Sequence, residues 1–528
     1  MSFNLATPVY RHSRANPTAL AVASAGAELT YAELARRAHA LAVTLGRSPS
    51  WQRRGRGLPR VAVLASRSVD ACVAVLGASW AGGTYVPISL KAPEEWLITL
   101  FERYPFAALV ADAEGAKLLS ARVLAACPAL VVRPDAPGPG SERAPDGLPA
   151  HHMNDLLDAA DGQPPHPLDQ QDLAYIIFTS GTTGEPKGVM ISCAAARHYI
   201  GVIVERLGLT ASDRVLETCE LSFDYSVHNM FSTWYAGGSL HILPARQVMN
   251  AVKFARDSRL TVWNSVPSLA GRLKQIKALS PGSLSGLRLT VFGGEQLPRS
   301  TVEAWRQAAP RSVIENLYGP TEATVFCLGQ RVDPLPAGTS ARDVLPIGAC
   351  LPGTEALILT AGRDLAAVGE AGELALGGCQ LAVGYLDAPE LTQERFPTIA
   401  GERWYCTGDL AMRDEDGVFH HIGRIDNQVK VLGHRVELEE VDAHLRAASA
   451  IDLVATVAWP FVSGAAQGLV AFVGTTTVDE KDLLARLRSR LPAYMVPSAV
   501  VAVDPMPLSS SGKVDRRALL DLLKQSER

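Results

Sequence analysis

Tyr-Ile-Ile-Phe-Thr-Ser-Gly-Thr-Thr-Gly-Glu-Pro-Lys-Gly, residues 175–188, joins an apolar run to a loop of small and hydroxylated residues. The run 175–178 predicts a buried β-strand. Glycines in the loop permit positive φ angles, so successive N–H groups can converge on an anion, and hydroxyl and ammonium groups add donors. The residues expected around that anion are Thr179, Ser180, Gly181, Thr182, Thr183, Gly184 and Lys187.

This loop has two other interpretations. It does not fit the pattern GxxxxGK[ST], so it is not a Walker-type phosphate loop. A plain Ser/Thr/Gly turn between two elements would account for only some of these residues, and the complete run 179–188 argues against it.

Apolar runs of β character alternate with helical patterns on the N-terminal side of the loop. Residues 60–65 and 84–88 predict strands, and the apolar spacing over 68–83 between them predicts a helix that stops at Gly-Gly. Residues 106–112 and 129–133 predict further buried strands. This alternation is typical of an α/β fold in which helices flank a sheet with many parallel strands.

Two stretches rich in Pro, Gly and charge, 47–60 and 133–150, are expected to be mobile loops. Near residue 424 the pattern changes to a segment with its own strands, helices and a lysine-bearing loop close to its end. We therefore predict a large N-terminal domain, 1–425, and a small α+β C-terminal domain, 426–528.

Composition excludes several classes of protein. The 528 residues carry a net charge of −4, which gives no reason to expect a nucleic-acid or membrane surface. Eight scattered cysteines lack metal-type spacing and are expected to be reduced thiols. No signal peptide and no apolar run of about 20 residues is present, so we expect a cytoplasmic protein.

Thr-Ser-Gly-Thr-Thr-Gly-Glu-Pro-Lys-Gly resembles the signature of the acyl-adenylate-forming superfamily, which includes peptide-synthetase adenylation domains, acyl-CoA synthetases and firefly luciferase. Further motifs follow in family order, and the forms YGPTEAT and GRIDNQVK favour the branch that activates amino acids. These motifs occupy residues 29–34, 81–88, 316–324, 372–378, 403–409, 423–441, 491–498 and 508–519.

The resemblance implies an ATP site. The loop 179–188 would hold the β- and γ-phosphates, Glu322 would bind Mg²⁺, and Thr321 would lie beside the α-phosphate. Tyr318 would offer an aromatic face to adenine, and the amide of Asn316 would hydrogen-bond the edge of adenine. Asp409 would accept hydrogen bonds from the ribose hydroxyls, and Arg424 would bind ribose or phosphate.

The resemblance also implies a mobile C-terminal domain that serves two half-reactions. Lys513 would bridge the substrate carboxylate and the α-phosphate during adenylation. Lys430 would belong to the opposite face, which admits a phosphopantetheine thiol after the domain rotates about a hinge at Asp426.

By the same resemblance, Asp224 would pair with the α-ammonium group of an amino acid; the alternative is that it only caps the following helix. Carried-over pocket positions most resemble a threonine-type site, and we expect threonine or a similar small polar amino acid. Departures at His228 and Phe326 leave serine, cysteine, 2-aminobutyrate and a modified threonine open. The expected walls are Tyr225, His228, Asn264, Val291, Gly293, Leu317, Val325 and Phe326.

We expect transfer to a separate carrier protein, because only 15 residues follow Lys513, and some relatives also need a small activator protein. The residues 151–155 superficially resemble a condensation-domain motif but have the wrong spacing, and we interpret them as a loop. Two alternatives remain: an acid–CoA ligase of the same fold, against which Asp224 argues, and a silent binding homologue. A silent homologue would be expected to have other residues at some of the positions of Lys187, Glu322, Asp409 and Lys513. All four residues are present in this chain.

Overall fold

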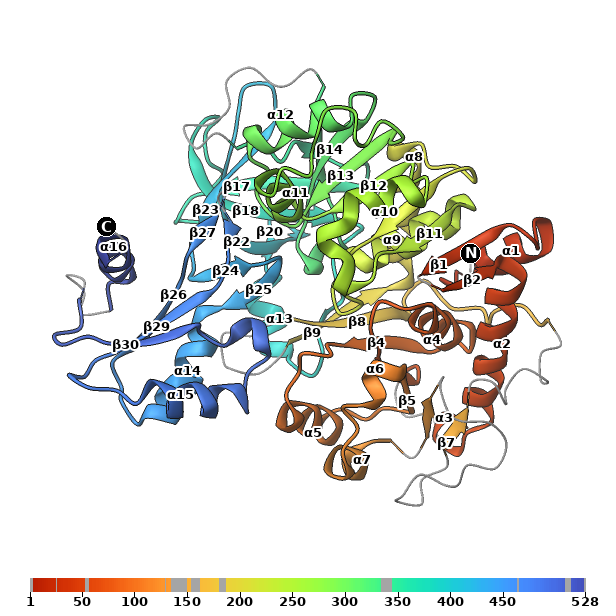
Figure 1. Ribbon diagram of the computed structural model, residues 1–528, viewed down its shortest axis with the longest axis horizontal. Coiled ribbons are helices and arrows are strands. Elements are labelled where there is room, and N and C mark those ends of the chain that lie inside the picture. The colour runs from red at the N-terminus through yellow and green to blue at the C-terminus, as the bar shows by residue number, and fades with distance from the viewer. Residues whose placement is uncertain are drawn as a thin grey trace. The chain divides into compact units, whose positions relative to one another are not determined.

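The computed structural model describes residues 3–24, 26–52, 57–128, 130–133, 150–152, 162–179, 187–333, 344–462, 465–508 and 514–526 (Figure 1). This described part divides into two compact units. Unit 1 comprises Met1–Leu90, Phe101–Phe178 and Gly188–Gly423. Unit 2 comprises Lys91–Leu100, Thr179–Lys187 and Arg424–Arg528.

Eight strands of the described residues form one sheet in the order β19-β9-β8-β4-β3-β5-β6-β7. The predicted strands near 60, 84, 106, 129 and 175 are confirmed, and neighbours from β8 to β7 pair in parallel. The predicted helix between β3 and β4 is α4 (Val69–Trp80), capped by the hydroxyl of Ser68. The strands are β3 (Arg60–Leu64), β4 (Thr84–Ile88), β5 (Ala108–Ala111), β6 (Val131–Arg133), β7 (Ala150–His152), β8 (Leu173–Thr179), β9 (Lys187–Ser192) and β19 (Gly384–Tyr385).

A second sheet contains nine described strands in the order β16-β15-β14-β13-β12-β10-β11-β1-β2. Its central strands β11, β10, β12, β13 and β14 run parallel to one another. The bounds are β1 (Leu20–Ser24), β2 (Ala27–Thr30), β10 (Arg214–Glu217), β11 (Ser239–Ile242), β12 (Val262–Ser265), β13 (Leu289–Gly293), β14 (Val313–Tyr318), β15 (Leu328–Arg331) and β16 (Ala349–Cys350).

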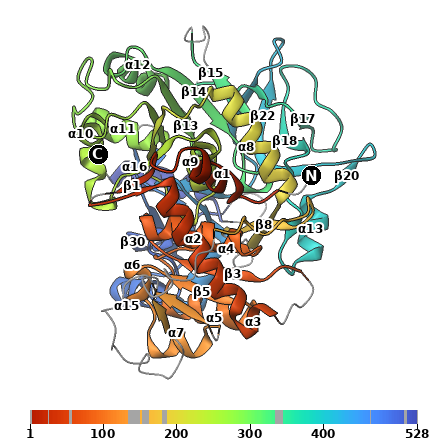
Figure 2. The same cartoon turned by 90° about the vertical axis from the view of Figure 1, so that its right-hand side faces the viewer.

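Helices cover both faces of this second sheet. On one face, α11 (Pro267–Gln275) and α12 (Arg299–Ala308) pack on Trp263 and Phe292, and the ring centroids of Trp263 and Trp305 lie 4.9 Å apart. Elsewhere in unit 1, α2 (Tyr31–Arg47) and α4 lie side by side in both views of the cartoon (Figures 1 and 2).

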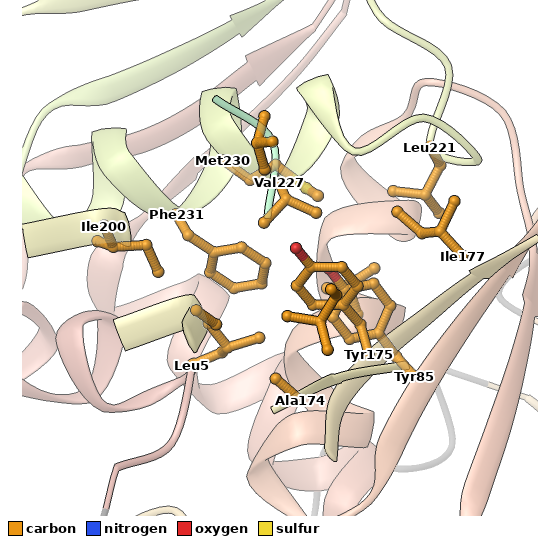
Figure 3. Packing of buried hydrophobic residues seen from close by; sticks show 14 of the residues in the cluster. Leu5, Tyr85, Ala174, Tyr175, Ile177, Ile200, Leu221, Val227, Met230 and Phe231 are labelled. Carbon is orange, nitrogen blue, oxygen red and sulfur yellow. The ribbon is translucent and has the colours of Figure 1, made fainter. Parts of the chain in front are cut away.

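Helix α9 (Tyr225–Ala236) connects the cores of the two sheets. Val227, Met230 and Phe231 of this helix face Tyr85 of β4 and Tyr175 of β8 (Figure 3). The ring centroid of Phe231 lies 6.2 Å from that of Tyr85. Because apolar contacts hold α9 firmly, the residues at its N-terminus have defined positions.

Unit 2 has the α+β composition predicted for the C-terminal segment. Its apolar core packs α14 (Leu438–Ser449) and α15 (Glu480–Arg488) against two small sheets. Its other elements include α16 (Arg516–Ser526), β24 (Gln428–Val431), β25 (His434–Glu437), β26 (Val454–Ala458), β27 (Phe461–Val462), β28 (Ala465–Ala466), β29 (Leu469–Val473) and β30 (Ala499–Ala502). Among the described residues, no helix combines the length and apolarity that crossing a membrane requires.

Two loop predictions are wrong in part. Residues expected in the first mobile loop form a short helix, α3 (Pro49–Gln52), because the Trp51 side chain is buried in the main core. His151 and His152, interpreted as loop, belong to the edge strand β7, whose backbone pairs with β6. Most of the second predicted loop, residues 134–149, lies outside the described residues.

Candidate functional site

The carboxyl ends of β12, β13 and β14 bring several predicted pocket residues together. Asn264 is the register partner of Val291, and Gly293 is the register partner of Leu317. In α/β folds, ligands bind in the crevice beyond the carboxyl ends of parallel strands. The predicted walls therefore occupy the edge of the sheet where a ligand is expected.

Asp224 lies at the N-terminus of α9, beside this edge. Its backbone occupies the N-cap position, but its side chain makes no capping hydrogen bond, so capping does not explain this residue. Burial, with Asp224 nearby as a second cause, raises the pKa of Tyr85 and of Tyr199 well above the usual value. The carboxylate therefore lies among protonated phenols and close to the positive end of a helix dipole.

Three aromatic side chains enclose the region next to Gly293. The Tyr225 and Phe326 rings are 5.1 Å apart, and the His228 and Phe326 rings are 5.5 Å apart. A Cβ atom on Gly293 would lie 2.6 Å from the Phe326 ring. The space that Gly293 leaves is therefore taken up by Phe326, and little room remains for a side chain of the substrate.

His228 is neutral in this pocket. Its Nδ1 lies 2.7 Å from the hydroxyl of Tyr199, and burial lowers the pKa of His228 to about 3. The His228 ring therefore acts as an uncharged aromatic wall with a polar edge.

The segment from Gly319 to Phe326 is an unusual piece of backbone. Thr324 and Val325 both have positive φ angles, 56° and 68°, which β-branched residues rarely adopt. A Cβ atom on Gly319 would lie 2.3 Å from the carbonyl oxygen of Val325, so only glycine fits. The buried side chain of Gln380 holds the segment by donating to the carbonyl oxygens of Ala323, Thr324 and Phe326 at 3.2, 3.5 and 2.9 Å.

Replacing Gln380 by methionine is expected to lower the free energy of unfolding by about 1–3 kcal/mol, because buried carbonyls lose their donor. The same change should lower kcat/KM about tenfold, since the segment carries Glu322 and Phe326. Urea denaturation and a turnover assay check this, with the exposed Gln247→Met as control. Unchanged stability would contradict the role given to Gln380.

Glu322 is a buried carboxylate, 1% exposed, on the short helix η3 (Thr321–Ala323). The hydroxyl of Tyr385 donates to its Oε1 at 2.8 Å. A buried carboxylate in a fixed orientation is a hard oxygen ligand of the kind that Mg²⁺ prefers. Thr321 is the neighbouring residue, so its hydroxyl and this carboxylate lie on one turn of chain.

The predicted nucleotide contacts gather around Asp409. The hydroxyl of Tyr318 donates to Asp409 Oδ2, and His421 Nε2 lies 3.3 Å from Asp409 Oδ1. Gln296 Nε2 lies 2.9 Å from His421 Nδ1 and orients that ring. Asn316, the predicted contact to the adenine edge, donates through Nδ2 to the carbonyl oxygen of Pro346.

The other predicted residues that the structure describes belong to unit 2. Arg424 binds both carboxylate oxygens of Asp426 at 2.6 Å, within unit 2. Lys430 is exposed on β24, Thr179 ends β8, and Lys187 begins β9. Residues 180–186 and Lys513 lie outside the described residues, and their roles stay predictions.

Sequence reasoning missed Gln380, Tyr385 and His421. The first two lie 56 and 63 residues from their partners Thr324 and Glu322, so no local pattern marks them. His421 had a weak signal, because it precedes the motif 423–441 on strand β23 (Phe419–Arg424).

This geometry agrees with comparisons with known proteins. Residues 9–386 match the family of AMP-binding enzymes, and residues 440–513 match the AMP-binding enzyme C-terminal domain. The chain belongs to the AMP-binding enzymes. It is thus an adenylation unit of the acyl-adenylate-forming superfamily, with the fold of AMP-forming ligases.

This AMP-binding enzyme is similar to two biosynthetic proteins and to a solved adenylation domain. Tyrocidine synthase 3 of Brevibacillus parabrevis is 36% identical over 93% of this chain, which spans 7% of that synthase. Novobiocin biosynthesis protein H of Streptomyces niveus is 34% identical over 98% of this chain and 82% of its own length. The Vibrio cholerae adenylation domain AlmE, solved with glycyl-adenosine-5'-phosphate, has a TM-score of 0.83 and 30% identity, covering 99% of this chain and 98% of AlmE.

Proposed function

We propose that this AMP-binding enzyme activates a small amino acid, with threonine as the first candidate, and transfers it to the phosphopantetheine thiol of a carrier protein. The observation that carries the proposal is Asp224, a carboxylate at the N-terminus of α9 beside a pocket closed by aromatic rings. A carboxylate at that place suits the ammonium group of an amino acid and is costly to leave beside a substrate without one.

In the proposed reaction, a carboxylate oxygen of the amino acid bonds to the α-phosphorus of ATP, and the bond from that phosphorus to the bridging oxygen breaks. Pyrophosphate leaves and aminoacyl-AMP remains. Bound Mg²⁺ would neutralise phosphate charge, and Glu322 is the residue that would hold it. Because charge builds up on phosphate oxygens, Thr321 and the predicted Lys513 act by positioning and electrostatic stabilisation.

Side-chain size limits the substrate. The Phe326 ring fills the space at Gly293, and the Tyr225 hydroxyl donates to the carbonyl oxygen of Val291 at 3.0 Å. We therefore expect a substrate with a short side chain and not an aromatic or long aliphatic one. The glycyl-adenylate found in AlmE makes glycine the alternative substrate to test alongside threonine.

ATP–pyrophosphate exchange with each of the twenty amino acids tests the first half-reaction. We expect exchange with small amino acids, highest with threonine, and none with phenylalanine or tryptophan. Product analysis with CoA against a pantetheinylated carrier protein tests the second half-reaction, in which the carrier should be the preferred acceptor. No exchange with any amino acid would refute the proposed function.

A further inference from the structure

A chain of buried polar side chains links the predicted wall residue Asn264 to two residues that the family resemblance does not assign. Glu217 ends β10, Asn229 lies on α9 and Asn264 lies on β12, and these side chains are 4%, 0% and 1% exposed. Asn264 Nδ2 donates to Asn229 Oδ1 at 2.8 Å, and Asn229 Nδ2 donates to Glu217 Oε1 at 3.0 Å. We call these three residues the buried relay.

The carboxylate sets the direction of the buried relay. Glu217 Oε1 accepts from Asn229 and also from the backbone N–H of Cys219, so the Asn229 amide must turn its NH₂ group toward it. Asn229 then offers its oxygen to Asn264, and Asn264 must turn its own NH₂ group toward Asn229. Reversing either amide would bring two acceptors face to face in a buried site, which is costly.

Protonation of Glu217 does not reverse this order. Burial raises the pKa of Glu217 to about 7, so the carboxyl group is partly protonated near neutral pH. Among the residues that the structure describes, none forms a hydrogen bond with Oε2. A proton on Oε2 therefore leaves Oε1 as an acceptor, and the direction of the relay is retained.

The relay ends in a buried acceptor at the pocket wall. Asn264 Oδ1 is inaccessible to solvent and makes no hydrogen bond with any described residue. The Tyr225 hydroxyl contacts the carbonyl oxygens of Ser265 and Val291, which are the chain neighbour and register partner of Asn264. A buried polar atom without a hydrogen-bond partner lowers stability by about 1–3 kcal/mol. We therefore expect a bound ligand to donate a hydrogen bond to this oxygen.

We propose that Glu217 and Asn229 are positioning residues that orient Asn264 so that its Oδ1 accepts a hydrogen bond from the side-chain hydroxyl of a small amino acid. The inference rests on the proposed function and deepens it, because it names the feature that selects the substrate. His228 Nε2 is a second buried polar atom that makes no hydrogen bond with the described residues. A site built to bond a hydroxyl rejects the isosteric hydrocarbon strongly.

The test is the ratio of kcat/KM for threonine to that for valine, which have nearly the same shape, in ATP–pyrophosphate exchange with the full chain. Asn229→Leu and Glu217→Leu should each lower this ratio about tenfold or more, because Asn264 is then free to turn. Glu217→Gln keeps an amide oxygen that accepts from Asn229, so its ratio should stay within about threefold of that of the unaltered protein.

A matched control separates selectivity from folding. Thr233 lies on the same helix, one turn from Asn229, and its hydroxyl donates to the Asn229 carbonyl oxygen at 2.6 Å. Thr233→Val should lower the melting temperature and leave the threonine-to-valine ratio unchanged. If Thr233→Val changes only the stability while the relay variants change the ratio, the relay acts on selectivity. A purely structural role of the relay would leave the threonine-to-valine ratio unchanged.

Three results would overturn the inference. If the unaltered protein exchanges equally with threonine and valine, or only with glycine, no hydroxyl is selected, although the proposed function stands. If folded Asn229→Leu keeps the original ratio, the relay has only a structural role. If no amino acid supports exchange, the proposed function fails, and the inference fails with it.

Discussion

Asp224→Asn is expected to lower kcat/KM for the amino acid by about 10²–10³-fold. The reason is that the α-ammonium group loses its charged partner in a site largely shielded from water, and removing one member of a buried charge pair costs about 2–5 kcal/mol. Asparagine retains the shape of the side chain, and the Asp224 side chain makes no capping hydrogen bond whose loss would weaken α9. The effect should therefore appear in activity and not in folding.

Exchange kinetics measured over a range of amino-acid concentrations check this prediction. The KM for the amino acid should rise, while the KM for ATP should change little. Asp364→Asn is a suitable control, because Asp364 is exposed and lies outside the pocket. Activity close to that of the unaltered protein in Asp224→Asn would mean that the ammonium group binds elsewhere.

Glu322→Gln is expected to lower kcat by about 10²–10³-fold, the usual cost of removing one electrostatic contribution to a transition state. Glutamine keeps an oxygen that can accept from Tyr385, so the local fold should be retained, but the charge that would hold Mg²⁺ is lost. The variant should also need a higher Mg²⁺ concentration to reach half of its maximal rate.

Tyr385→Phe provides the comparison for this variant. It removes the hydrogen bond to Glu322 Oε1 but keeps the carboxylate, so we expect a loss of about tenfold in kcat. A Mg²⁺ titration of the exchange rate distinguishes the two variants. If Glu322→Gln matched the unaltered protein in both rate and Mg²⁺ requirement, the proposed metal role of Glu322 would be wrong.

Several strands of the first sheet were predictable because each is a short apolar run whose residues pair within a buried parallel sheet. The runs at β3, β4, β5 and β8 have this pattern, and the structure has strands there. Helix α3 and strand β7 were not predictable. One depends on the burial of Trp51 in the main core, and the other on backbone pairing with β6, which side-chain patterns do not reveal.

Some residues of the candidate site were also predictable from the sequence, and others were not. Glu322 and Asp409 lie inside contiguous motifs, so their residue types and order alone indicated a chemistry, and the family resemblance indicated Asp224. Gln380, Tyr385 and the residues Glu217 and Asn229 of the buried relay lie outside those motifs. Their importance depends on contacts with Thr324, Glu322 and Asn264 that only folding creates.

From its sequence alone, this protein could be assigned to an α/β adenylate-forming family and given a list of candidate site residues, because local patterns and motif order carry that information. Tertiary structure decided how those residues are held: the Phe326 ring occupies the space beside Gly293, Gln380 holds a strained segment, and Glu217 orients an acceptor through Asn229. The physical reason is that hydrogen-bond direction and free volume are properties of side chains brought together by packing, and sequence spacing does not determine them.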